Sequence, residues 1–306
     1  GKVIVVGSGI SEINLGDFTP IGISGKPFSG TFDGSGVNFK LDINKPETDY
    51  VGLFGVLQSG VVENLSVSGS VIGNNRVGGI VGQQNTGSIV RNVYNTAYVE
   101  ANNYVGGIVG YLDRGILENS YNRGEVVAAR YAGGIVGGTN AAYNANINTI
   151  RNVYSSGLVS ADLNVGGVVG IEGTATYANN TRTNLYYDVT VIANYDQPLD
   201  KIKPSAVKNT TNRTTGLNTS ELFTEMGNKL NDQWFLKPIT NNYGYYPQLR
   251  YFSENPNSQI KARSEELNTI NIVNGIGSED RPFLIREITD LEKLKQKIEN
   301  NNNFEG

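Results

Sequence analysis

The chain has 306 residues with 38 glycines, 17 tyrosines, a formal net charge of −4, and neither cysteine nor histidine. The missing residue types exclude disulfides, zinc sites built on Cys or His, iron–sulfur clusters, and Ser-His-Asp or Cys-His catalysis. The negative charge argues against a nucleic acid or anionic membrane partner, and no apolar run is long enough to predict membrane insertion.

Residues 1–50 alternate glycine-rich turns with short apolar stretches, which predicts irregular opening coils of a repeat structure. Residues 51–197 then contain a glycine motif whose five copies begin 26, 28, 27 and 33 residues apart. The copies are Val51-Gly-Leu-Phe-Gly55, Val77-Gly-Gly-Ile-Val-Gly82, Val105-Gly-Gly-Ile-Val-Gly110, Ala132-Gly-Gly-Ile-Val-Gly137 and Val165-Gly-Gly-Val-Val-Gly170. Polar insertions around 138–149 and 172–183 stretch the period and predict surface loops.

A unit of about 27 residues with short β-branched strands and no helical periodicity has the length of one coil of a parallel β-helix. We therefore predict an all-β fold, a parallel β-solenoid with small helical capping elements. Stacked coils bring equivalent residues into columns about 4.8 Å apart. The paired glycines predict a corner where the backbone has positive φ or approaches a neighbouring coil closely.

Two columns follow from aligning the repeats. A shared asparagine predicts an amide ladder from coil to coil, through Asn64, Asn92, Asn119, Asn152 and Asn184. The position before it alternates in charge over four coils, through Glu63, Arg91, Glu118 and Arg151. Because opposite charges would then be cross-strand neighbours, this alternation favours stacking.

These motifs resemble the GLUG motif of bacterial surface proteins, which also occurs in non-catalytic parts of IgA-peptidase-like metalloproteases. The similarity rests on Val-Gly-Gly-Ile-Val-Gly followed by Glu118-Asn-Ser-Tyr-Asn-Arg-Gly124, and it extends to Asp17-Phe-Thr-Pro-Ile-Gly22. The resemblance implies a β-helix module. The His-Glu-x-x-His zinc motif of the peptidase relatives has no counterpart here, so their proteolysis is not implied.

After the solenoid (1–197), residues 198–252 are expected to close the module. A helix over 220–230 is predicted from Leu222, Phe223, Met226 and Leu230, and Trp234 and its aromatic neighbours would cover an open end. Residues 253–306 are predicted to be a linker and a second capping segment, with a helix from Thr289 to Glu299. In relatives a similar segment precedes the first coil, which implies that this one starts the next tandem module.

Tyrosines are the candidate contacts for a partner. Tyr94, Tyr121, Tyr154 and Tyr186 share one column two residues after the ladder asparagine. Facing outward they would form a platform for a sugar or protein, and facing inward they would only pack. Tyr143 and Tyr177, inside the two insertions, are also candidate partner-binding residues.

The remaining chemistry is that of carboxylates, Arg, Lys and Tyr. Glu63 and Glu118 are the candidate acids of a carbohydrate-active β-helix enzyme, but Arg91 lies between them, which favours a salt-bridged ladder. No calcium-loop spacing is present, so neither a metal nor a cofactor is predicted. The preferred function is a non-enzymatic stalk or adhesive module of a bacterial surface or secreted protein, binding a host or neighbouring-cell glycan or protein. A polysaccharide lyase or hydrolase is the alternative.

Overall fold

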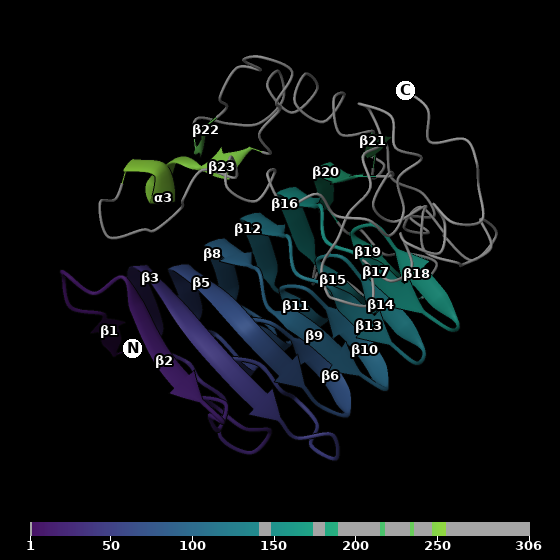
Figure 1. The fold of residues 1–306 in the computed structure, drawn as a ribbon, viewed down its shortest axis with the longest axis horizontal. Coiled ribbons are helices and arrows are strands. Elements are labelled where there is room, and N and C mark those ends of the chain that lie inside the picture. The colour runs from purple at the N-terminus through teal and green to yellow at the C-terminus, as the bar shows by residue number, and fades with distance from the viewer. Residues whose placement is uncertain are drawn as a thin grey trace, which may run out of the picture.

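The fold is a parallel β-solenoid of about six turns with about 28 residues per turn, as the sequence period predicted (Figure 1). A computed structural model describes residues 2–140, 148–173, 181–188, 215–217, 233–235 and 247–254. The predicted helices at 220–230 and 289–299, and the middle part of each insertion at 141–147 and 174–180, lie outside these residues.

A regular coil places four strands around the core, and each strand pairs in parallel with its equivalents in the coils before and after. The first ladder contains β6 (Asn75–Gly78), β10 (Asn103–Gly106), β14 (Tyr131–Gly133) and β18 (Asn164–Gly166). The second contains β4 (Phe54–Leu57), β7 (Val81–Gln84), β11 (Val109–Leu112), β15 (Val136–Thr139) and β19 (Val169–Glu172).

The third ladder contains β3 (Thr31–Asn44), β5 (Val61–Ile72), β8 (Ile89–Asn95), β12 (Ile116–Asn122), β16 (Thr149–Ser155), β20 (Thr181–Asp188) and β21 (Thr215–Leu217). The fourth continues from the end of β5 through β9 (Tyr98–Ala101), β13 (Val126–Ala128) and β17 (Val159–Ala161). At the amino-terminal end, β1 (Val3–Val5) and β2 (Glu12–Gly16) both pair with β3.

The core consists of columns of inward side chains, because alternate residues of each strand point into the coil. One such column runs Val62, Val90, Leu117 and Ile150, each fully buried. In the last coil the equivalent position is Arg182. Its guanidinium is 0% exposed, and its Nε donates to Glu172 Oε1 at 2.8 Å. The apolar column therefore ends in a buried ion pair.

The paired glycines are required because neighbouring backbone and side-chain atoms approach them closely, which is one of the two reasons that the sequence predicted. A Cβ on Gly106 would lie 2.1 Å from the carbonyl oxygen of Val109, and a Cβ on Gly107 would lie 2.2 Å from Cγ of Asn122. Positive φ instead falls on the residue just before the motif, with values of 59° at Arg76 and 51° at Tyr104. The residue with positive φ thus lies two positions before the first glycine of the motif.

A short closing block lies beside the third ladder (Figure 1). It comprises β22 (Trp234–Phe235), which pairs antiparallel with β23 (Gln248–Leu249), and α3 (Arg250–Glu254). Trp234, Leu249 and Phe252 are buried against the tyrosine column of β8, β12, β16 and β20. The described part of this segment therefore covers a lateral face of the solenoid, where the sequence suggested cover for an open end.

Candidate functional site

Polar and aromatic side chains gather on the outer face of the first two ladders, which we call the Tyr104 face. One column on this face occupies the position before the glycine motif and reads Tyr50, Arg76, Tyr104, Tyr131 and Asn164. A neighbouring column on the second ladder reads Gln83, Tyr111 and Gly138. The members Arg76, Tyr104, Tyr111 and Tyr131 are half-buried, so this face is open to solvent.

Arg76 lies between aromatic rings of different coils. Its guanidinium carbon is 4.6 Å from the ring centroid of Tyr111 and 5.5 Å from that of Tyr50. One of its terminal nitrogens, Nη1, donates to Oε1 of Gln83. Cation–π contact and this hydrogen bond position the charge, yet none of the ion pairs among the described residues includes Arg76.

The tyrosines of the face contact one another across coils. The rings of Tyr104 and Tyr131 are 5.1 Å apart at 31°, and Tyr104 meets Tyr111 edge-on at the same separation. A Cβ on Gly138 would lie 2.5 Å from the Tyr104 ring, so glycine at that position makes room for it. Burial, with a smaller contribution from Tyr104, raises the pKa of Tyr111 above its usual value. The phenol of Tyr111 is therefore a neutral hydrogen-bonding group at physiological pH.

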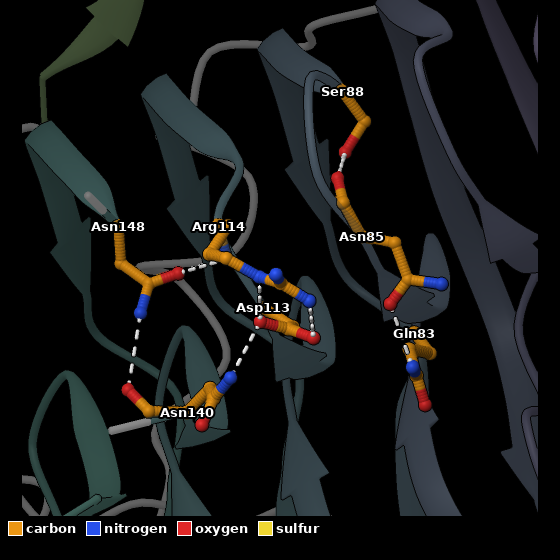
Figure 2. Close-up of polar contacts among 7 residues, drawn as sticks. All are labelled: Gln83, Asn85, Ser88, Asp113, Arg114, Asn140 and Asn148. Carbon is orange, nitrogen blue, oxygen red and sulfur yellow. Dashed lines mark hydrogen bonds and ion pairs between the residues drawn. The ribbon is translucent and has the colours of Figure 1, made fainter. Parts of the chain in front are cut away.

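Polar corners border the face, and Figure 2 shows the residues that form them between the second and third ladders. Asp113 accepts hydrogen bonds from Nε and Nη2 of Arg114 at 2.7 and 3.0 Å and from Nδ2 of Asn140 at 2.7 Å. Burial tends to raise the pKa of Asp113, but the bonds from Arg114 and Asn140 outweigh it, and the pKa lies below its usual value. The carboxylate stays ionised, which makes it a poor proton donor.

The tyrosine column predicted as a possible platform is mostly covered by the chain itself. Tyr94, Tyr121 and Tyr154 stack at 4.8 and 5.0 Å with nearly parallel rings. Tyr121 and Tyr154 are fully buried, and the Tyr154 hydroxyl donates to the carbonyl oxygen of Pro247 at 2.7 Å. A partner cannot reach these two rings while the closing block is in place, so their role is packing, and only Tyr94 is half-buried. Tyr143 and Tyr177 lie outside the described residues.

The charge column is in the register expected from the repeats. Glu63, Arg91, Glu118, Arg151 and Thr183 are cross-strand neighbours in that order. Arg91 Nε donates to Glu63 at 2.6 Å, and Arg151 is paired with Glu118 at 2.5 Å. The two glutamates considered as catalytic acids are thus each bound to an arginine of the next coil, which favours a structural role for both.

The residues of the asparagine column share a left-handed backbone conformation, and several of their side-chain amides are hydrogen-bonded between coils. Its residues Asn64, Asn92, Asn119, Asn152 and Asn184 all have positive φ, between 47° and 57°. Asparagine tolerates this left-handed region better than other residues with a Cβ. Side-chain amides also bond between coils, from Asn92 to Asn64, from Asn152 to Asn119 and from Asn184 to Asn152, at 3.2, 3.2 and 2.9 Å.

Sequence reasoning missed a second, fully buried amide pair and the Tyr104 face. Asn95 donates to Asn122 at 2.9 Å, and each also caps the turn that follows it. The aligned repeats contain a signal for both features. The buried amide pair directly follows the tyrosine column, and the column of Arg76, Tyr104 and Tyr131 directly precedes the glycine motif. Within the described ranges, no cluster of three or more Asp or Glu residues has metal-binding geometry, and no helix is long and apolar enough to cross a membrane.

Comparisons with known proteins agree with the fold. The GLUG motif matches residues 101–127, from the last residue of β9 to the second residue of β13, which is about one coil. An immunoglobulin A1 protease-like protein from Bacteroides ovatus has a similar structure, with a TM-score of 0.52 and 22% identity over 81% of this chain and 75% of that chain. No curated protein matches the sequence. The chain thus contains a GLUG-motif β-helix, and at this identity the structural likeness concerns the fold alone.

Proposed function

We propose that this chain is a non-enzymatic module of a large bacterial surface or secreted protein, where it acts as a stiff stalk and contacts a glycan or protein of a host or neighbouring cell. An extracellular location is part of this proposal. The observation that carries it is the continuity of the ladders, because parallel pairing joins every coil from β3 to β20. Such stacking resists bending and repeats the same surface along the rod.

The arrangement of the carboxylates favours binding over catalysis. A glycosidase needs two free carboxyl groups flanking a substrate bond. Glu63 and Glu118 are each paired with an arginine, and Asp113 is held by Arg114 and Asn140. Groups that are fully engaged in this way position neighbouring side chains and are not available to transfer protons.

The amino-terminal end offers a surface for a neighbouring module. Strand β1 pairs with β3 on one side, while Val3 and Val5 are 67% and 61% exposed. An exposed strand edge with apolar side chains is a template for docking. We propose that adjacent modules of the same protein meet head to tail at this end.

A binding screen coupled to a degradation assay tests the function. The isolated chain is applied to a glycan array and to immobilised surface proteins, and each bound polysaccharide is then incubated with the chain and analysed for chain shortening. Binding without shortening is the expected result. Shortening that disappears in Glu118→Gln would replace the proposal with the enzyme alternative, and an absence of binding to every surface would remove the adhesive part.

A further inference from the structure

We propose that the Tyr104 face binds an acidic oligosaccharide, a linear glycan that carries carboxylates, laid along the axis on which the coils stack. The inference rests on the proposed adhesive function and names its ligand class. It depends on Arg76 and Arg130, two cationic side chains of this face that take part in none of the ion pairs among the described residues.

Aromatic rings position the guanidinium groups of both arginines. Arg130 is exposed, and its guanidinium carbon lies 5.3 Å from the ring centroid of Tyr131. Like Arg76, it takes part in none of the ion pairs among the described residues. Both charges are therefore positioned by aromatic rings and remain available to an anion. This contrasts with Arg91 and Arg151, which are paired with glutamates.

The Asp113 carboxylate, which interacts with the charge of Arg76, is already bonded to other side chains. The charge of Asp113 contributes to the raised pKa of Tyr111, and the charge of Arg76 contributes to the lowered pKa of Asp113. Its carboxylate nevertheless accepts three hydrogen bonds from Arg114 and Asn140. Because Arg114 neutralises Asp113, the charges of Arg76 and Arg130 make the face locally positive on a chain whose net charge is −4.

The donors of the Tyr104 face lie on successive coils. Arg76 belongs to the coil of β6, Tyr104 to the next coil, and Tyr131, with the adjacent Arg130, to the one after. Two coil steps separate the cations by roughly 9–10 Å along the axis. A linear oligosaccharide repeats on a length similar to one coil, so its carboxylates can meet both arginines while a central sugar faces Tyr104.

The chemistry of the face suits a sugar better than a peptide. Besides the two guanidinium groups it presents the phenol hydroxyls of Tyr104, Tyr111 and Tyr131, which can bond to the hydroxyl groups of a glycan. Protein interfaces usually require an apolar centre. Among the described residues, the large exposed hydrophobic side chains are at positions 3, 4, 5, 10, 23 and 163, and only Leu163, one coil beyond Arg130 in the register of β14 with β18, borders this face.

The test is calorimetric titration of the full chain with a short oligogalacturonate. The same oligomer with its carboxyl groups reduced to alcohols is the neutral control, and an oligoglutamate peptide of equal charge is the acidic peptide control. Wild type is expected to bind the oligogalacturonate, more weakly as salt is added. The reduced oligomer and the peptide are expected to bind at least about tenfold more weakly, because each lacks either the charged or the hydroxyl contacts.

Variants assign the binding to the face. Arg130→Gln, an exposed position, and Arg76→Gln are each expected to reduce the affinity roughly tenfold, which is the effect of losing one charged hydrogen bond. Lys40→Gln removes an exposed positive charge on β3 and should leave it unchanged. Thermal melts show whether each variant is folded, and Arg130→Gln carries the test if Arg76→Gln is unstable.

Three results would overturn the inference: no binding of the oligogalacturonate, equal binding of the reduced oligomer or the peptide, or equal losses in Lys40→Gln and Arg130→Gln. Failure here is distinct from failure of the adhesive function. If the array shows binding to a neutral glycan or a protein, the module is adhesive and only the assignment of an acidic ligand to the Tyr104 face is wrong.

Discussion

Replacing Gly106 by alanine is expected to destabilise the solenoid strongly, even though alanine is the smallest possible addition. The new Cβ would lie 2.1 Å from Val109 O, 2.6 Å from Gly137 N and 2.8 Å from Ile135 O. All three atoms belong to the backbone, and two of them are on the next coil. A rotamer change therefore cannot relieve the overlap, and the coils themselves would have to separate.

The size of the effect follows from the cost of overpacking, which is about 1–3 kcal/mol. Because the blocking atoms are backbone, we expect the upper end, about 3 kcal/mol. For a domain of this size each kcal/mol lowers the melting temperature by about 2–4 °C, so Gly106→Ala should melt about 6–12 °C below wild type. The measurement is far-UV circular dichroism during thermal unfolding.

The matched control is Gly25→Ala. A Cβ at Gly25 meets nothing within 4 Å, and its φ is not positive. This variant should stay within about 0.5 kcal/mol of wild type. If Gly106→Ala and Gly25→Ala melted at the same temperature, the claim that the glycine motif exists to allow close approach between coils would be refuted.

Three further predictions concern charged groups. In low salt Glu118→Arg should cost at least about 1 kcal/mol in urea unfolding, since it breaks an ion pair with the next coil and places three arginines in one column, whereas Lys40→Glu should cost less. The pKa of Asp113 is lowered in the fold, so its stabilising effect is present above its unfolded value near 3.9 and lost as the pH falls through the folded value. The stability difference between wild type and Asp113→Asn should therefore shrink from pH 6 to about pH 2 in urea titrations. Glu172→Leu should cost about 3–5 kcal/mol because it leaves Arg182 buried without a counter-ion, and adding Arg182→Leu should restore most of the loss.

Each of these three has a clear contrary result. Equal unfolding midpoints for Glu118→Arg and wild type would mean that the charge column does not contribute to stacking. A stability difference at Asp113 that is independent of pH would contradict the lowered pKa. A double leucine variant at 172 and 182 no more stable than the single variant would show that the buried pair is needed for more than charge compensation.

The sequence period determined the coil and its register without help from distant contacts. Each residue of a stacked coil has its own equivalent above and below, so Glu63, Arg91 and Glu118 had to be neighbours once the coil length was known. The same reasoning places Asn92 next to Asn64. What the period could not decide was which of the two expected reasons for the glycines holds. They allow close approach between coils, and positive φ occurs two residues earlier, at Arg76 and Tyr104.

Which surfaces remain open was decided only by the tertiary structure. The tyrosine column of β8, β12 and β16 and the Tyr104 face look alike in the sequence, since both repeat once per coil. Trp234 and Phe252, far along the chain, bury Tyr121 and leave the other face half-exposed. A repeat contains information about its nearest coils alone. The face that a segment outside the repeat covers depends on packing between residues far apart in the sequence, and the local period does not indicate it.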